Sequence, residues 1–127
     1  MTREMIYTPA APQAIGPYSQ AIRTGSLVFT SGQVGIDPAT GQLVPGDITA
    51  QTHQVFANLK AVLAAAGTSL DRVAKATCFL RSMDDFKAFN AVYAQYLGEI
   101  KPARSTFAVS GLPLNAAVEI DLVATCD

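Results

Sequence analysis

The chain has 127 residues, of which 50% are hydrophobic and 15% charged, and its formal net charge at pH 7 is −1. This length is typical of one domain, residues 1–127, that buries about two-thirds of its unfolded surface. The basic residues are scattered, which argues against nucleic acid as the main ligand. The apolar content is high for a soluble domain, so we expect some apolar surface to lie in contacts between subunits.

Membrane spans, disulfide frameworks and metal motifs are not indicated by the composition. No apolar run reaches the ~18 residues that a membrane span needs. The first residues lack the apolar segment of a signal peptide, so we expect a cytoplasmic protein without a membrane partner. Cys78 and Cys126 are too few for a disulfide framework, and with a single histidine they form no recognisable zinc motif.

The N-terminal segment predicts a short strand followed by an extended loop. Residues 5–7 are the strand candidate, and three prolines and Gly16 precede Tyr18 in the loop. Glycine and proline restrict the backbone there. The loop therefore either holds the Tyr18 hydroxyl for a ligand or uses the Tyr18 ring to pack onto the body of the protein.

A hairpin is predicted next. Residues 21–23 and 27–30 are apolar strand candidates that flank Gly25 in the turn. Ser31 and Gly32 end the second strand, and glycine at that point permits either a bulge or the close approach of a ligand to the backbone.

Two helices are predicted, each with its own boundary signals. Asp47 can cap a helix that runs to about Ala66, where Gly67 ends it. Ser82 begins a motif with capping-box spacing ahead of a second helix that reaches about Leu97. Apolar residues recur at helical spacing in both segments, so one face of each helix is expected to be buried.

Between the two helices, residues 73–81 alternate with the period of a β-strand. The apolar face is expected to consist of Ala74, Ala76, Cys78 and Leu80. Cys78 is then a core thiol rather than a reactive one. The opposite face is mixed and carries Lys75.

The C-terminal quarter predicts two more strands, residues 102–109 and 118–124, joined by a turn. If they pair and bury their apolar residues together, Arg104 and Glu119 fall on one shared face. The residues expected to be buried together are Phe107, Val109, Ile120 and Leu122. A guanidinium binds a carboxylate bidentately, and a carboxylate can orient or deprotonate a water, so the pair is a candidate small-anion site. The alternative is a solvated ion pair, as is common on strand surfaces.

The order of strands, helix, strand, helix and two strands indicates an α+β fold with a mixed sheet of about six strands. Two helices can cover one face of such a sheet. The other face carries apolar residues among polar ones, and a subunit interface is its natural cover.

Five stretches of the sequence resemble the Rid family (reactive intermediate deaminases, also called the YjgF family). They are AIGPYSQA at 14–21, FTSGQ at 29–33, FKAFNAVY at 86–93, PARS at 102–105, and Leu112-Pro113 with Val118-Glu119-Ile120. They occur in the family's order along nearly the whole chain. The resemblance implies a chorismate-mutase-like fold and a homotrimer with its sites in clefts between subunits.

The resemblance also implies a chemistry. Rid proteins hydrolyse reactive imines and enamines released by pyridoxal-phosphate enzymes, such as 2-aminoacrylate, to 2-keto acids and ammonia. The deaminase itself uses no cofactor. By this resemblance Arg104 grips the substrate carboxylate and Glu119 holds the attacking water. The remaining cleft residues that it implies are Tyr18, Ser31, Gly32, Asn90, Thr106 and Lys75.

Thr106 departs from the pattern, because many family members carry cysteine two residues after the arginine. This puts a thiol-based role at the position in doubt, including a chaperone switch triggered by oxidation. Hydrolysis loses no required group, since a threonine hydroxyl can still donate or accept a hydrogen bond.

Three functions are therefore weighed. The first is a 2-iminobutanoate/2-iminopropanoate deaminase. The second is a trimer that binds small carboxylates or a partner protein in the same clefts without turnover. The third is RNA cleavage, which some family members have been assigned and which the charge balance disfavours here.

Overall fold

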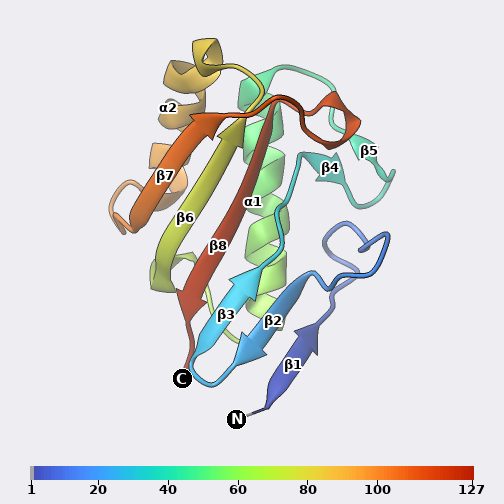
Figure 1. Ribbon diagram of the computed structural model, residues 1–127, viewed down its shortest axis with the longest axis vertical. Coiled ribbons are helices and arrows are strands. Elements are labelled where there is room, and N and C mark those ends of the chain that lie inside the picture. Colours follow the sequence, from blue (N-terminus) through green and yellow to red (C-terminus); the bar gives the residue numbers. More distant parts are fainter. Residues whose placement is uncertain (1) are drawn as a thin grey trace.

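The computed structural model describes residues 2–127 of the chain, and it has an α+β architecture (Figure 1). Within this range lie two sheets and two α-helices, with both helices against one face of the larger sheet. The strands are β1 (Arg3–Ile6), β2 (Ala21–Thr24), β3 (Leu27–Thr30), β4 (Ile36–Asp37), β5 (Gln42–Leu43), β6 (Val73–Leu80), β7 (Ala103–Ala108) and β8 (Val118–Thr125). The helices are α1 (Ile48–Ala65) and α2 (Phe86–Leu97), with short 3-10 turns η1 (Leu70–Arg72), η2 (Met83–Asp85) and η3 (Pro113–Asn115).

The larger sheet has six strands in the order β1-β2-β3-β8-β6-β7 within the described residues. Neighbouring strands are antiparallel except for β6 and β7, which are parallel because α2 carries the chain back between them. The predicted mixed sheet of about six strands with two helices is therefore confirmed. β4 and β5 form a separate two-stranded sheet.

The predicted limits of α1 are confirmed by its capping contacts. Asp47 Oδ1 accepts hydrogen bonds from the backbone N–H groups of Thr49 (3.0 Å) and Ala50 (3.4 Å). Beyond the last turn, Gly67 has a φ of +84°, a left-handed conformation that favours glycine after a helix. The capping box expected at Ser82 is not formed, because Ser82 instead caps η2 through the N–H of Asp84.

The core lies between the sheet and the helices. In β8 every second residue is buried, as its alternation predicted, and these residues are Val118, Ile120, Leu122 and Ala124. Facing them are fully buried side chains of α1 and α2, including Phe56, Leu59, Leu63 and Phe89. The central strand β8 is thus held by packing along its whole length.

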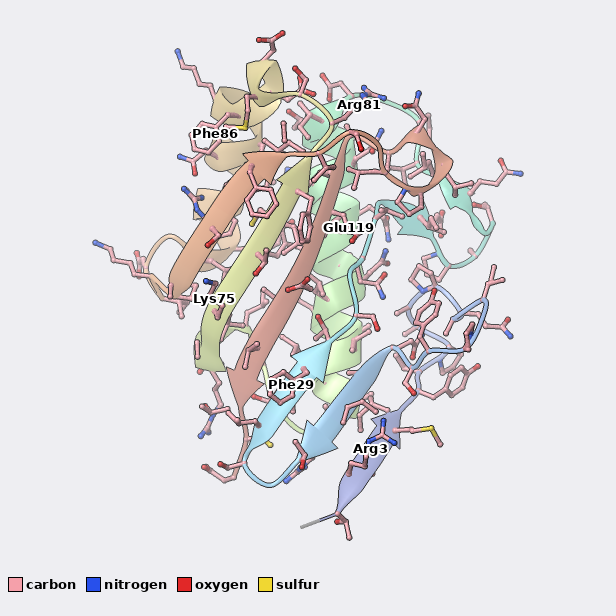
Figure 2. The ribbon with its side chains drawn as sticks, viewed as in Figure 1. Arg3, Phe29, Lys75, Arg81, Phe86 and Glu119 are labelled. Atoms are coloured by element: carbon pink, nitrogen blue, oxygen red, sulfur yellow. The ribbon has the colours of Figure 1, made fainter. Side chains whose placement is uncertain are left out.

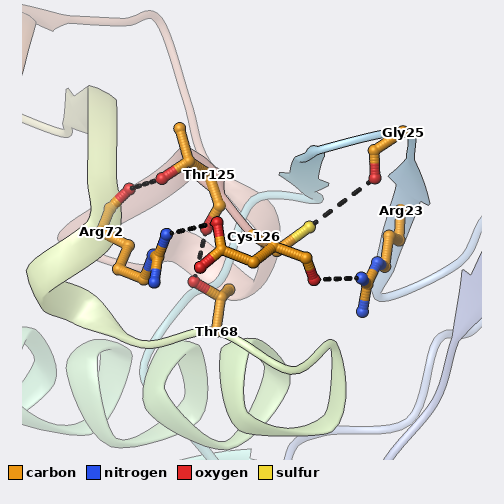
Figure 3. Close-up of polar contacts among 7 residues, drawn as sticks. Arg23, Gly25, Thr68, Arg72, Thr125 and Cys126 are labelled. Carbon is orange, nitrogen blue, oxygen red and sulfur yellow. Dashed lines mark hydrogen bonds and ion pairs between the residues drawn. The ribbon is translucent and has the colours of Figure 1, made fainter.

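The end of β8 is also held by polar contacts (Figure 3). Arg23 donates to the carbonyl of Ala66, just past α1, and to that of Asp127. Thr68 Oγ1 donates to the carbonyl of Thr125 over 2.6 Å. A cation near a helix C-terminus is favourable, so these contacts fix β8 relative to α1.

Two predictions about β6 and β7 are wrong. Strand β7 does not pair with β8, because β6 lies between them. Phe107 is consequently not buried with Ile120: it is 45% exposed and packs edge-on against Phe79 at 5.3 Å on the far side of the sheet. At the start of β6 a register shift leaves Val73 buried and Ala74 exposed, the reverse of the predicted pattern.

The sheet face opposite the helices is covered by no helix of the described chain (Figure 1). Phe29 (43% exposed), Lys75 and Glu119 are spread across this open face (Figure 2). Its mixture of aromatic and charged side chains agrees with the mixed character expected from the sequence. Separately, no helix within residues 2–127 has the length and apolar character that crossing a membrane requires.

Candidate active site in two halves

Glu119 is the centre of the first group of candidate residues. It lies half-buried on the open face of β8, and burial, with a further contribution from the nearby Asp121, raises the pKa of its carboxyl group. Gly32 runs directly over it: a Cβ atom at this position would collide with the Glu119 carboxylate. The close approach foreseen at Gly32 is therefore an approach to a protein carboxylate. The backbones of Gln33 and Ile120 exchange two hydrogen bonds, of 2.9 and 3.1 Å, and these hold Gly32 against Glu119.

Tyr18 faces the same place. It lines a pocket of about 130 Å³ together with Gly32, Glu119 and Pro113. The residue is 53% exposed, which leaves it available to a ligand. The bend before it is made at Gly16, whose φ of +122° is a conformation that residues with a side chain rarely adopt.

Gln20 holds the loop that carries Tyr18, a role that was not predicted from the sequence. Its buried amide accepts from the N–H of Thr8 (2.7 Å) and donates to the carbonyls of Thr8 (3.0 Å) and Pro12 (2.8 Å). Its position directly before Ala21, the buried first residue of β2, was the available signal. Ser31 ties the other end of the loop, donating to the Ser19 carbonyl over 2.6 Å. We call Tyr18, Ser31, Gly32 and Glu119 the acid half-site.

Arg104 is the centre of the second group. It is the second residue of β7, at the edge of the sheet, and its guanidinium lies over the rings of Tyr93 (4.6 Å) and Phe86 (5.6 Å). Its Nη1 donates to Asn90 Oδ1 over 2.7 Å. The predicted cleft residues Asn90 and Arg104 are therefore in direct contact, beside an open hollow that Lys101 also lines.

Thr106 lies two residues further along β7, and its Oγ1 is buried without a hydrogen-bond partner among the described residues. Its neighbour on β6 is Cys78, which is fully buried, and burial raises the pKa of that thiol to about 12. Cys78 is therefore a core thiol, as expected, and not a nucleophile at neutral pH. We call Asn90, Arg104 and Thr106 the arginine half-site.

Lys75 belongs to neither half-site in this chain. It pairs with Val123, whereas Glu119 pairs with Phe79 four residues further along β6, a separation of about 13 Å at the usual rise per strand residue. Its Nζ donates to Ser105 Oγ over 3.3 Å. Its charge also lowers the pKa of Asp121, which burial raises.

The two half-sites lie on opposite faces of the sheet. Arg104 is in register with the buried Ala76 and points to the helix side, while Glu119 is in register with Phe79 of the open face. The prediction that Arg104 and Glu119 share a face is therefore wrong. It depended on β7 pairing with β8, and the intervening β6 changes which residues of β7 face the helices. One chain alone cannot bring the guanidinium and the carboxylate together.

The family model described as "Endoribonuclease L-PSP" matches residues 8–126. The chain belongs to this family, which is the Rid (YjgF) family. Similar Rid-family sequences include a RutC family protein of Pyrococcus horikoshii, 52% identical over 96% of this chain and 97% of that protein. A 2-iminobutanoate/2-iminopropanoate deaminase of Capra hircus is 44% identical over 98% of this chain and 90% of that protein.

The fold of this Rid protein is also that of solved family members. A crystal structure of E. coli TdcF with bound serine has a TM-score of 0.92 and 39% identity, and the match covers 98% of this chain and 99% of that chain. Names within the family range from deaminase to endoribonuclease. Family membership alone therefore does not decide between these activities, and the choice depends on the chemistry of the two half-sites.

Proposed function

We propose that this Rid-family protein is an imine/enamine deaminase that hydrolyses 2-iminobutanoate and 2-iminopropanoate to 2-keto acids and ammonia. The observation that carries the proposal is a pair of complementary half-sites. One offers a guanidinium that binds an anion, and the other a half-buried carboxylate of raised pKa beside a backbone turn. The deaminase names of relatives at 44% identity support the same reaction.

The complete site on this proposal forms between two subunits of a homotrimer. Arg104 and Glu119 lie on opposite faces of one chain, so a second copy must supply one of them. Strand β7 is at the edge of the sheet, and the open face exposes Phe29 and Phe107. An exposed apolar face next to an unpaired edge is typical of a surface that another subunit covers.

The reaction then follows from the residue types. Arg104 holds the carboxylate of the 2-imino acid in a bidentate contact, and Glu119 accepts a proton from the water that attacks C2. The water oxygen bonds to C2, the electron pair of the C=N bond passes to nitrogen, and nitrogen takes up a proton to become an amine. In the second stage the amine gains a further proton while the new hydroxyl on C2 loses one. The C2–N bond then breaks, and ammonia leaves as the 2-keto acid forms. Holding water and imine in register contributes several kcal/mol of rate acceleration, on the order of 7 or more in well-oriented systems.

The chemistry explains why no covalent nucleophile or cofactor is assigned. C2 of a 2-imino acid is already electrophilic, so the protein has only to position two reactants and move protons. Tyr18, which lines the same pocket as Glu119, is proposed to orient the substrate or its leaving ammonia. Ser31, Gly32, Asn90 and Thr106 are proposed to line the cleft, and Lys75 to lie at its margin.

A coupled assay tests the proposal. A threonine dehydratase generates the 2-imino acid, and formation of the 2-keto acid is followed with and without this protein. We expect the wild type to accelerate it, Arg104→Ala to abolish the gain, and Arg104→Lys to restore little because an ammonium lacks the planar fork. Lys60→Ala, at an exposed position on α1, is the control. A rate equal to buffer in the presence of the wild type contradicts the proposal.

The alternative of binding without turnover draws on the E. coli TdcF structure, which holds serine. A non-catalytic trimer would bind 2-keto acids in calorimetry with the same dependence on Arg104 but would not accelerate imine decay. Glu119 discriminates between the two, since a site that only binds carboxylates gains nothing from a second negative charge. RNA cleavage, the activity that the family's name describes, is tested with single-stranded RNA and the same Arg104→Ala variant.

A further inference from the structure

The guanidinium of Arg104 is held without a counter-charge. Within residues 2–127 the salt bridge that forms is Arg72–Asp127, and Arg104 takes part in none. Its partners are two ring faces and a side-chain amide oxygen. Cation–π contacts and a neutral acceptor orient a guanidinium while leaving its positive charge available to an anion.

The holding groups come from one face of α2. Phe86, Asn90 and Tyr93 are spaced i, i+4 and i+7, which places them above one another on a helix. We call these three residues the guanidinium seat. Because they belong to a single rigid element, the orientation of Arg104 does not depend on a loop.

Tyr93 is the fixed part of the seat. Its side chain is 6% exposed, and its ring contacts Phe56 and Phe89 at centroid distances of 5.9 and 5.7 Å. Phe86, at the start of the helix, is only partly buried and lies farther from the guanidinium. The closer and better-packed ring therefore determines where Arg104 can point.

The hydroxyl of Tyr93 contributes nothing to this contact. It is buried and has no hydrogen-bond partner among the described residues. A buried hydroxyl without a partner lowers stability, so a phenylalanine at this position would keep the ring face and lose only that penalty. Tyr93→Phe is therefore a conservative substitution that tests the ring separately from the hydroxyl.

We propose that Tyr93 is a positioning residue for carboxylate recognition: its ring aligns the Arg104 guanidinium for bidentate contact with the substrate carboxylate, and its hydroxyl is dispensable. The inference rests on the proposed function for its ligand, a 2-imino or 2-keto acid. It adds to that function a residue that touches no substrate and acts only through Arg104.

The test compares three substitutions on the intact protein. Tyr93→Leu is expected to raise KM in the coupled imine assay about tenfold and to change kcat much less, since a well-buried cation–π contact is lost. Tyr93→Phe should retain the wild-type KM. Val92→Ala removes side-chain volume at a buried position of the same helix outside the seat, and it controls for loss of packing alone.

Calorimetric titration with 2-oxobutanoate gives the same comparison without turnover, so the seat is tested even if the protein proves not to be a deaminase. Equal effects of Tyr93→Leu and Val92→Ala on binding would overturn the proposal, as would a Tyr93→Phe variant as weak as Tyr93→Leu. If Tyr93→Leu does not fold, Phe86→Leu replaces it, with an expected weakening of about threefold for the more distant and more exposed ring. An unchanged affinity in that variant then counts against the seat.

Discussion

The acid half-site and the arginine half-site are built in different ways. The acid half-site sets loop residues against Glu119 of strand β8, and the loops are held by backbone hydrogen bonds and by the buried amide of Gln20. The arginine half-site is made of a strand edge lying on a helix, held by aromatic rings. One buries a carboxylate against its own backbone, and the other presents a guanidinium whose charge is not neutralised. The difference suggests that water activation needs an enclosed acid, whereas carboxylate binding needs an accessible cation.

The largest expected effect is on the chemical step. Glu119→Gln keeps the shape of the acid half-site but cannot accept a proton, so kcat should fall by about 10²–10⁴-fold. Affinity for 2-oxobutanoate should be retained, because the carboxylate contact is assigned to Arg104. Glu4→Gln on β1 is the matched control, and a loss of keto acid affinity equal to the loss in kcat would contradict the division of roles.

The division between subunits predicts complementation. Arg104→Ala and Glu119→Gln chains are each expected to be inactive, but trimers refolded from an equal mixture should regain about a quarter of the wild-type activity, since random assembly places both intact residues in that fraction of sites. Refolding each variant alone is the control. No gain on mixing would contradict the proposal that neighbouring subunits supply the two residues of a site.

Gly32→Ala tests the close approach within the acid half-site. A Cβ atom there would force the Glu119 carboxylate out of place, so kcat should fall at least about tenfold, as expected when a catalytic group is displaced by an ångström or so. Gly111→Ala is the matched control, because a Cβ atom at Gly111 has no neighbour within 4 Å. An active Gly32→Ala variant would show that Glu119 need not occupy its present position.

Local signals in the sequence predicted local structure. The Asp47 cap, the Gly67 stop and the alternation of β8 each depend on residues a few positions apart, and all three are confirmed. These features require no knowledge of which element lies next to which. The cleft residues were assigned through the family resemblance, and the structure divides all of them except Lys75 between the two half-sites.

Long-range pairing was the part that local signals did not reveal. Alternation in β7 shows that the side chains of Arg104 and Phe107 lie on opposite faces of the sheet, but it does not show which of the two faces the helices. That depends on β6 inserting between β7 and β8 after α2 returns the chain. The role of Gln20 was missed for a related reason, since its partners Thr8 and Pro12 lie in a loop without periodicity.

The smallest expected effect is a shift in pH dependence, and it concerns the acid half-site alone. Burial and the charge of Asp121 both raise the pKa of Glu119. Asp121→Asn removes that negative charge and leaves Lys75 without its carboxylate neighbour, and both changes favour the ionised form of Glu119. The pKa of Glu119 should fall, so the acidic limb of the kcat profile should move to lower pH while KM stays near the wild-type value. Asp71→Asn, exposed on η1, is the control. A shift of the acidic limb to higher pH would mean that Glu119 does not act as the ionised base. Tyr93→Leu changes the arginine half-site, which lies across the sheet from Glu119, so this variant should leave the acidic limb where it is in the wild type.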